Sequence, residues 1–500
     1  MRTITTKSLR LLACTLVLAA VALMAPGLAS ASKNQLSLIQ EDRELLAFSG
    51  VMSPENAMRE IAALGADVVR TNIIFYKTYR NPEERSKPPG FDTSNPDSPQ
   101  YDWHRIDRLV SLARQNGLGV FATVTGPGPL WATANPAACT GVPCARNPSV
   151  SEFGQFAAAV AKRYQGQINY YSIWNEPNLD GWIQPQQKRP SVRRVQTEAK
   201  IYRKLWIAGY RSIAKFDPAR RNRVMFGEVA AIGEPLPLLY GALCLDIKGR
   251  PFKRRMARKH GCGRRPAKLN IGGFAIHPYN ANAYGSPRSK TRSKTALPLA
   301  YMPRLHRLID VAKRFRRIRR RAPILSTEFG FQTKPPERGL GTRTAPSPAK
   351  QAQYINEADR LFYGDPRVTM VSQYELTDPP ETDVFNSGLR FAENSGRDVK
   401  PSYEAYRMPI VVTRRSRRSV EVYGQLRPGG SASVQIQAAK GGGSFTAVRS
   451  ARTNGRGMFK VNVRRAGATR LRWRLALSGP GGLTTSRIAK AGKPLRYYRN

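Results

Sequence analysis

Short apolar runs alternate with longer stretches whose apolar residues recur at helical spacing. Residues 101–116 and 150–164 repeat apolar positions every three or four residues, as a helix with one buried face does. Residues 66–75 are instead rich in β-branched residues, and residues 120–125 are continuously apolar or β-branched, which is typical of strands. The predicted strands are 44–49, 66–75, 120–125, 170–176, 223–228, 272–279, 322–328 and 368–374. This alternation predicts a (β/α)8 TIM barrel over residues 32–408, with its chemistry at the carboxyl ends of the strands.

The pattern changes at residue 409. From there to residue 500, apolar and polar residues alternate with a period of two, and Gly-rich turns separate the runs. The clearest strands are 419–424, 433–437, 458–463 and 471–477. Short strands at this spacing predict an all-β sandwich of immunoglobulin-like type. It is either an accessory surface-binding module or a packing domain without a ligand.

The first 31 residues have the composition of a signal peptide. Positive residues near the start precede the apolar stretch 11–24, and Ala29-Ser30-Ala31 fits a cleavage site. An N-terminal membrane anchor is the alternative, but the apolar stretch is short for a span of about 20 residues. We therefore expect a secreted mature chain that begins near Ser32 and has no transmembrane segment.

Four cysteines remain after Cys14 leaves with the signal peptide. Proximity in the sequence favours two disulfides, Cys139 with Cys144 and Cys244 with Cys262. A zinc site is the competing interpretation, but no CxxC spacing supports it.

The chain is strongly basic, with 82 Lys and Arg against 34 Asp and Glu and a formal net charge of +48. Such a surface attracts polyanions in a salt-dependent manner. No recognisable nucleic-acid-binding module accompanies the charge, so no specific nucleic-acid partner is expected. A compositional excess of Arg explains part of it.

Two glutamates stand where apolar strands end. Glu176 follows the aromatic run 170–174, and Glu328 follows the β-prone run 322–327. Either one alone is more often a solvated or ion-paired residue. Two carboxyl groups at the same end of a barrel are what hydrolysis of a glycosidic bond requires.

The sequences Trp-Asn-Glu-Pro-Asn at 174–178 and Ser-Thr-Glu-Phe-Gly at 326–330 resemble the motifs of clan A glycoside hydrolases. The resemblance covers about residues 35–408 and is closest to family 5, which is cellulase-like, and family 39. It implies a retaining hydrolase of O-glycosidic bonds in which Glu176 is the general acid/base and Glu328 the nucleophile. It also implies that no metal or organic cofactor is required.

The resemblance assigns further residues. Asn175 would bind the sugar 2-hydroxyl, Tyr279 would donate a hydrogen bond to Glu328, and His277 would line the site. Arg70 would keep the nucleophile ionised through its positive charge. Without the resemblance, His277 and Arg70 would be interpreted as structural residues.

Two departures concern substrate binding. Residues 123–131 lack the histidine usual after strand three in family 5, and their turn ending in Trp131 is closer to family 39. Tyr374 stands near the position where a tryptophan usually forms the floor of the sugar subsite. The candidate residues for stacking on a sugar ring are Trp131, Tyr279, Tyr374 and Trp182, and Trp131 is as readily a core residue.

Basic residues dominate the predicted loops 248–268, 288–294 and 334–350. We expect the substrate to be a polysaccharide. In a barrel these loops surround the active site, so their charge favours an anionic one. A general Arg excess tolerated in loops explains the same pattern. The alternative to an enzyme is a catalytically inactive carbohydrate-binding or cell-surface adhesion protein on the same barrel.

Overall fold

The computed structural model describes residues 32–48, 51–187, 191, 196–263, 265–280, 283–319, 322–336, 345–380, 385–392, 399–479 and 482–498. The predicted signal peptide, residues 1–31, lies outside the described residues. Within the described part of the chain, no helix has both the length and the apolar character needed to cross a membrane.

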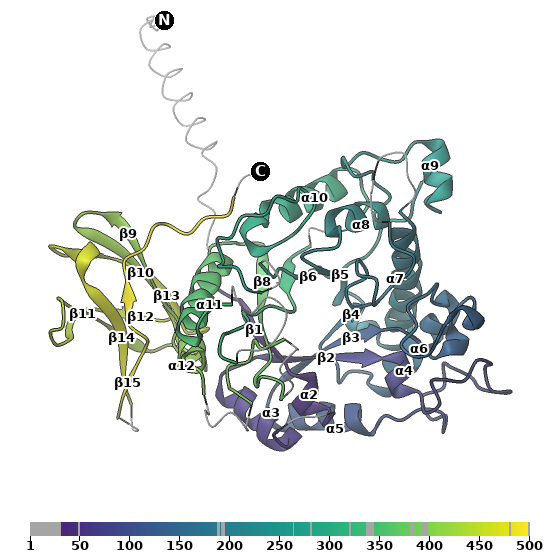
Figure 1. Cartoon of the computed structure of the whole chain (residues 1–500), viewed down its shortest axis with the longest axis horizontal. Helices are drawn as coiled ribbons and strands as arrows, with labels where there is room; N and C mark the ends of the chain where they lie inside the picture. Colours follow the sequence, from purple (N-terminus) through teal and green to yellow (C-terminus); the bar gives the residue numbers. More distant parts are fainter. Residues whose placement is uncertain are drawn as a thin grey trace, which may run out of the picture.

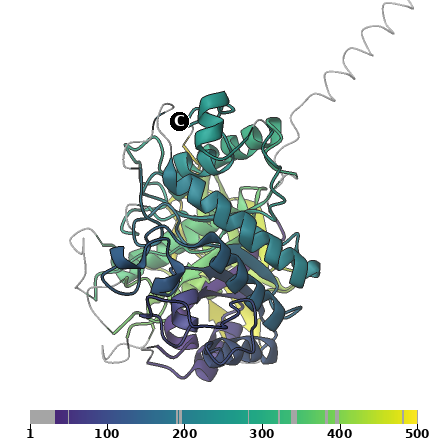
Figure 2. The ribbon, with the colours of Figure 1, turned by 90° about the vertical axis from the view of Figure 1, so that its right-hand side faces the viewer.

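Eight parallel strands close into a barrel, which confirms the predicted (β/α)8 fold (Figure 1, Figure 2). The strands are β1 Leu36–Gln40, β2 Val68–Ile74, β3 Gly119–Thr125, β4 Tyr170–Ile173, β5 Val224–Ala230, β6 Phe274–His277, β7 Ile324–Ser326 and β8 Val368–Tyr374. Strand β1 pairs in parallel with both β2 and β8, so the sheet has no open edge.

The barrel interior has an apolar layer nearer the amino ends of the strands and a polar layer nearer their carboxyl ends. One layer is a compact apolar cluster formed by Leu38, Val68, Phe121, Met225, Ala275, Leu325 and Met370. Side chains in a strand alternate between the two faces, so the inward position two residues farther along is Gln40 in β1, Arg70 in β2 and His277 in β6. The apolar layer therefore supports a polar layer at the carboxyl ends of the strands.

Helices surround the barrel. They are α3 Pro54–Ala63, α4 Phe75–Thr78, α5 His104–Gln115, α6 Val150–Arg163, α7 Thr197–Phe216, α8 Pro235–Ala242, α9 Arg254–Lys259, α10 Pro303–Arg314, α11 Pro348–Tyr363 and α12 Pro401–Arg407. Helices α5 and α6 lie within the ranges 101–116 and 150–164 predicted from the apolar periodicity.

The prediction of a first strand at 44–49 is wrong. The strand is β1, and the short helix α2 Asp42–Leu45 follows it. The polar residues of β1 concealed it, because their partners are distant in sequence: the Ser37 hydroxyl accepts a hydrogen bond from Arg427, and Gln40 accepts one from Arg70. The Glu41 side chain then caps α2 by accepting from the Glu44 backbone N–H.

The chain beyond α12 forms two antiparallel sheets, as predicted for a β-sandwich. Strands β9 Ile410–Ser416, β10 Ser419–Gln425 and β13 Met458–Arg464 form one sheet. The other contains β11 Ser433–Ala439, β12 Thr446–Arg452, β14 Arg472–Gly479, β15 Gly482–Thr485 and β16 Ala489–Lys490. An apolar cluster that includes Trp473 fills the space between the sheets. The immunoglobulin-like type stays a prediction.

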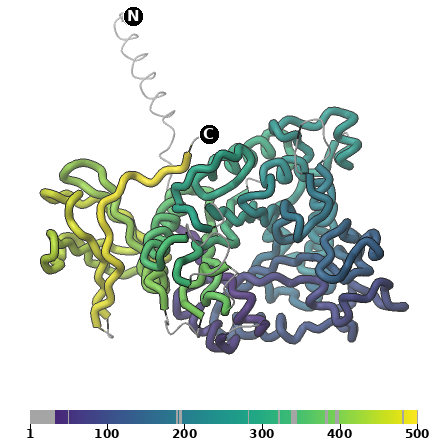
Figure 3. The backbone as a smooth tube through the Cα atoms, in the orientation of Figure 1, coloured from purple at the N-terminus to yellow at the C-terminus, as the bar shows by residue number. Residues whose placement is uncertain are grey.

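The sandwich contacts the barrel through its first sheet. Tyr363 at the end of α11 packs with Val411, Tyr423 and Met458, and Arg360 of the same helix pairs with Glu421 at 2.6 Å. The chain after β16 then returns to the barrel, where the Tyr498 backbone N–H donates to the Ala300 carbonyl (Figure 3). The sandwich is therefore attached at both ends of its sequence.

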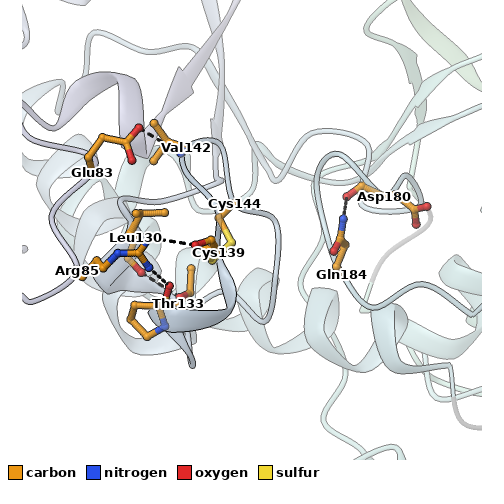
Figure 4. The surroundings of a disulfide bond; sticks show 10 residues. Glu83, Arg85, Leu130, Thr133, Cys139, Val142, Cys144, Asp180 and Gln184 are labelled. Atoms are coloured by element: carbon orange, nitrogen blue, oxygen red, sulfur yellow. Dashed lines mark hydrogen bonds between the residues drawn. A yellow bond between two sulfur atoms is a disulfide. The ribbon is translucent and has the colours of Figure 1, made fainter.

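Both predicted disulfides are present. Cys139 bonds to Cys144, and Cys244 bonds to Cys262. The first closes a loop after β3, which Arg85 supports by donating to the Cys139 carbonyl at 3.1 Å (Figure 4). The disulfides thus staple two loops that follow barrel strands.

Candidate active site

The predicted catalytic residues meet at the carboxyl end of the barrel. Glu176 lies three residues beyond the end of β4, and Glu328 lies two residues beyond the end of β7. His277 is the last residue of β6, and Arg70 lies in the middle of β2. A fifth residue, Glu228 of β5, also enters this group.

The backbone is unusual at the points that deliver two of these carboxylates. Glu176 and Glu228 have positive φ angles of 39° and 48°. Glu228 lies at an irregularity between β5 and β6, where the pairing register shifts between Gly227 and Val229. A bulge of this kind re-aims a side chain, and here it turns Glu228 toward Arg70 and His277. Left-handed backbone at non-glycine residues is costly and tends to be found at functional sites.

His277 lies between three carboxylates. Its Nδ1 atom is 3.0 Å from Glu176 Oε1 and 2.7 Å from Glu328 Oε2. Its Nε2 atom is 2.8 Å from Glu228 Oε2. The imidazole is fully buried, so this one ring fixes the relative positions of all three glutamates.

The two predicted catalytic carboxyl groups are close together. One oxygen of Glu176, one of Glu328 and a ring nitrogen of His277 all lie within 4.8 Å of one another. This separation suits a carboxylate that attacks a carbon while the other carboxyl group protonates the oxygen attached to it.

Arg70 reaches this group from its position within β2. Its Nη2 atom lies 2.6 Å from Glu228 Oε2 and donates to Asn175 Oδ1 at 2.8 Å. Both Arg70 and Glu228 are fully buried. Asn175 is therefore held next to Glu176 by a charged donor, and Gln40 accepts a further hydrogen bond from Arg70.

The charges within this network shift the pKa values of its own side chains. Burial would raise the pKa of Glu228, but Arg70 and His277 outweigh it and lower the pKa to about 2. Burial also works to raise the pKa of Glu328, and the positive charge of His277, followed by Arg70, brings it below its ordinary value. Burial disfavours the imidazolium form of His277, yet Glu328 and the other carboxylates raise its pKa well above 6.5.

Tyr279 is placed differently from the expectation. Its hydroxyl is buried and has no hydrogen-bond partner among the described residues, whereas His277 contacts Glu328. The Tyr279 ring instead packs 5.1 Å from Phe385 and 6.4 Å from Tyr374. Tyr279 and Tyr374 thus belong to an aromatic wall. Burial, with the charge of Glu328 as a further cause, raises the pKa of both hydroxyls well above their ordinary value.

Trp131 does not join this wall. Its ring packs edge-on against Phe75, Tyr79 and Phe91, at centroid distances of 5.5 to 5.8 Å, and the residue is 8% exposed. It is part of the apolar core around the barrel, and we do not include it in the sugar subsite.

The sequence analysis missed Glu228. It was assigned to a strand, but period-two alternation gave no reason to turn it inward. Two signals were available in hindsight: a lone carboxylate within the apolar run 224–230, and a glycine directly before it. Phe385 was also missed, since it lies in a segment without helical or strand periodicity.

The trio of Glu176, His277 and Glu328 carries atoms of the types that bind divalent metals. A metal ion would need an unprotonated ring nitrogen on His277. Both ring nitrogens of His277 lie within hydrogen-bond distance of carboxylate oxygens, so we interpret the trio as part of an ion-paired network.

No protein-family model and no curated protein matches the chain. Several solved structures resemble it. A psychrophilic glycoside hydrolase family 10 endo-β-1,4-xylanase is 14% identical, with 75% of this chain and 96% of that chain covered and a TM-score of 0.42. Xylanase XynB from Paenibacillus barcinonensis is 14% identical, covering 76% and 99%, with a TM-score of 0.40. A glycoside hydrolase family 5 enzyme from Prevotella bryantii B14 is 11% identical, covering 75% and 96%, with a TM-score of 0.42.

All three are glycoside hydrolases or xylanases by name. At this identity and overlap, the likeness carries no argument about substrate or mechanism. Those must come from the site itself.

Proposed function

We propose that this protein is a retaining glycoside hydrolase. The observation that carries the proposal is the pair of carboxyl oxygens of Glu176 and Glu328 within 4.8 Å, at the carboxyl end of a (β/α)8 barrel. Retaining glycosidases hold their carboxyl groups about 5–5.5 Å apart, whereas inverting enzymes leave about 6.5–9.5 Å for a water molecule. The separation in this site favours retention.

In the first step, the Glu328 carboxylate attacks the anomeric carbon, and Glu176 gives its proton to the departing glycosidic oxygen. The lowered pKa of Glu328 keeps it ionised for this attack. In the second step, Glu176 takes a proton from water, whose oxygen attacks the anomeric carbon and releases Glu328. Glu176 thereby regains its proton.

The other residues position this pair. His277 touches both carboxyl groups and holds them at a fixed separation. Asn175 accepts from Arg70 through Oδ1, and its Nδ2 group, which has no partner among the described residues, is left to donate to the sugar 2-hydroxyl. Tyr279 and Tyr374 offer an aromatic wall against which a sugar ring packs.

We extend the proposal to a secreted enzyme that acts on polysaccharide. Two disulfides and the predicted signal peptide support export, since disulfides persist in oxidising compartments. Residues 247–268 and 286–298, in the loops after β5 and β6, contain no Asp or Glu but many Lys and Arg. Such a basic surface attracts an acidic polymer.

The first test is hydrolysis of a panel of activated aryl β-glycosides and of neutral and acidic polysaccharides. Glu176→Gln and Glu328→Gln should each lower kcat by at least about 10²- to 10⁴-fold, the range that a positioned catalytic carboxyl group contributes. Glu404→Gln is the control, because Glu404 lies on the surface of α12 and pairs only with Arg407 among the described residues. Proton NMR of the first product should show a retained anomeric configuration.

An inverted product would contradict the mechanism. Equal rates for wild type and both glutamine variants would contradict the proposal that the protein is a glycoside hydrolase. Saturable glycan binding without turnover, unchanged in both variants, would favour the inactive carbohydrate-binding protein instead.

A further inference from the structure

The C-terminal sandwich is almost free of acidic residues. Residues 410–500 contain twenty Lys and Arg and a single acid, Glu421. Glu421 is already engaged by Arg360 and Arg415, and its side chain is 4% exposed. Among the described residues of this domain, the remaining positive charge therefore has no acidic partner within the domain.

One sheet of the sandwich has a free outer face. The sheet of β13, β10 and β9 is covered by α11, whereas β11, β14 and β15 lie on the side away from the barrel (Figure 1). In β11, Val434 and Ile436 point into the sandwich core, so Gln435 and Gln437 point outward. The register pairs Gln437 with Arg474, which brings both to the outer face.

Five residues on this face form an ordered array, named here the Arg–Gln face: Gln435, Gln437, Phe445, Arg472 and Arg474. The Arg474 and Arg472 guanidinium groups lie 4.4 Å and 5.1 Å from the centre of the Phe445 ring. Arg474 Nε donates to Gln437 Oε1 at 2.8 Å, and Gln437 Nε2 donates to Gln435 Oε1 at 3.1 Å. These contacts hold two guanidinium groups and two amides in fixed positions.

The two arginines keep donors available. Arg472 Nη1 and both Nη atoms of Arg474 have no hydrogen-bond partner among the described residues, whereas Arg472 Nε is buried and Arg472 Nη2 donates to the Gly443 carbonyl at 2.9 Å. In the described part of the chain, neither Arg472 nor Arg474 forms an ion pair with an Asp or Glu side chain. A guanidinium fork held in place is preorganised to bind a carboxylate through two hydrogen bonds.

We propose that the Arg–Gln face binds an acidic polysaccharide, at a site separate from the barrel. The uronate carboxylates pair with Arg472 and Arg474, and a ring hydroxyl hydrogen-bonds to the exposed amide of Gln435. Gln437 is only 8% exposed, and it serves to hold Arg474 and Gln435 in place. Nucleic acid fits less well, because the stacked guanidinium groups occupy the ring of Phe445 on which a base would stack. Because binding is measured without turnover, the proposal does not depend on the proposed glycosidase activity.

The test uses the full chain carrying Glu328→Gln, with polygalacturonate as the probe in isothermal titration calorimetry at two salt concentrations. Arg472→Gln combined with Arg474→Gln should weaken binding at least tenfold. The matched control is Arg417→Gln with Arg418→Gln, which removes the same charge from the exposed turn between β9 and β10 and should change Kd less than twofold. Hydrolysis of a small aryl glycoside by the otherwise unmodified enzyme should be unaffected by either pair.

A second variant separates geometry from charge. Arg472→Lys with Arg474→Lys keeps the net charge but removes the planar forks, and it should weaken binding several-fold. If the glutamine pair fails to fold, the lysine pair still tests the proposal. Equal affinities for the lysine pair and wild type would overturn the proposal.

Three further outcomes would overturn it. Equal losses in the Arg472/Arg474 and Arg417/Arg418 glutamine pairs would mean that net charge alone binds the polymer. Equal binding of methyl-esterified polygalacturonate would remove the carboxylate from recognition. Duplex DNA bound as tightly, with the same dependence on Arg472 and Arg474, would assign the face to nucleic acid.

Discussion

His277 shows how one side chain organises the candidate site. Its two nitrogens face three glutamates, and its buried positive charge lowers the pKa of Glu228 and of Glu328. Glu228, in turn, shares its Oε2 atom between His277 and Arg70. Glu228 is thus a positioning residue, because it acts on the proposed catalytic pair through its neighbours.

Replacing Glu228 tests this role. In Glu228→Gln, the buried Arg70 guanidinium loses its ionised partner, so we expect the free energy of unfolding to fall by about 3–5 kcal/mol. Urea unfolding at neutral pH measures this change. The acidic limb of the kcat/KM profile should also move to lower pH, because the charge of Arg70 then acts on Glu328 without compensation.

The comparison variant is Glu55→Gln, which removes the partner of Arg108 on the protein surface. It should change stability much less, since solvent screens exposed ion pairs. A Glu228→Gln protein with both the stability and the pH profile of wild type would show that Glu228 is not needed for positioning.

At the scale of the element, the irregularity in β5 determines where Glu228 points. Gly227 has a φ angle of +119°, and a Cβ atom there would lie 2.5 Å from the Ala275 carbonyl oxygen of β6. Gly227→Ala should therefore separate β5 from β6 and lower the free energy of unfolding by about 2–4 kcal/mol. The loss combines the steric clash of the new Cβ with the Ala275 carbonyl and the backbone strain of a positive φ. Thermal unfolding and kcat of the same preparation measure the effect.

Gly117→Ala is the matched control, because Gly117 also has a positive φ, of +70°, but has open space around its Cβ position. It should cost only the backbone strain, about 1 kcal/mol. Similar losses in both variants would contradict a specific need for glycine at the β5 irregularity.

Most elements of the barrel could be predicted because apolar periodicity is a local property. Strand β8 was predicted with its observed bounds, and α6 and α11 within a residue or two. Strand β1 was missed because Ser37 and Gln40 look like loop residues until their partners from distant segments are known. The inward turn of Glu228 was missed for the same reason, since a bulge depends on pairing with β6.

The sequence predicted only some of the side chains that gather at the carboxyl end of the barrel, and it did not predict the contacts among them. The motifs placed Glu176 and Glu328 correctly at two strand ends, yet sequence carries no distance between them. The resemblance linked Tyr279 to Glu328, whereas the closure of the barrel brings His277 there. Trp131 was undecided because a tryptophan in a turn has the same sequence signal in a core and in a subsite.

At the scale of the whole molecule, buried carboxyl groups couple stability to pH. Burial, with Glu44 nearby, raises the pKa of Glu41 from 4.5 to about 8. The folded state then keeps a proton that the unfolded state releases, so its stabilisation is complete below about pH 4.5 and is lost as the pH rises toward 8. Urea unfolding should show a decrease of up to about 1.4 kcal/mol per pH unit from this group.

Glu41→Gln should flatten this dependence between pH 5 and 8. The amide oxygen can still accept the backbone N–H groups of Leu376 and Thr377, so the variant keeps the local hydrogen bonds. The difference between wild type and variant isolates Glu41 from other titrating groups. A difference that does not change over this pH range would refute the assignment.

The chain after β16 returns to the barrel, so the sandwich is connected by its first strand and by the segment whose Tyr498 backbone contacts Ala300. A domain on a single linker can swivel, whereas two attachments leave little rotational freedom. Under the proposed roles, the Arg–Gln face and the catalytic mouth keep a constant separation. A polymer long enough to reach both meets the second surface at an effective concentration set by the dimensions of the protein, and no longer by the concentration of polymer in solution.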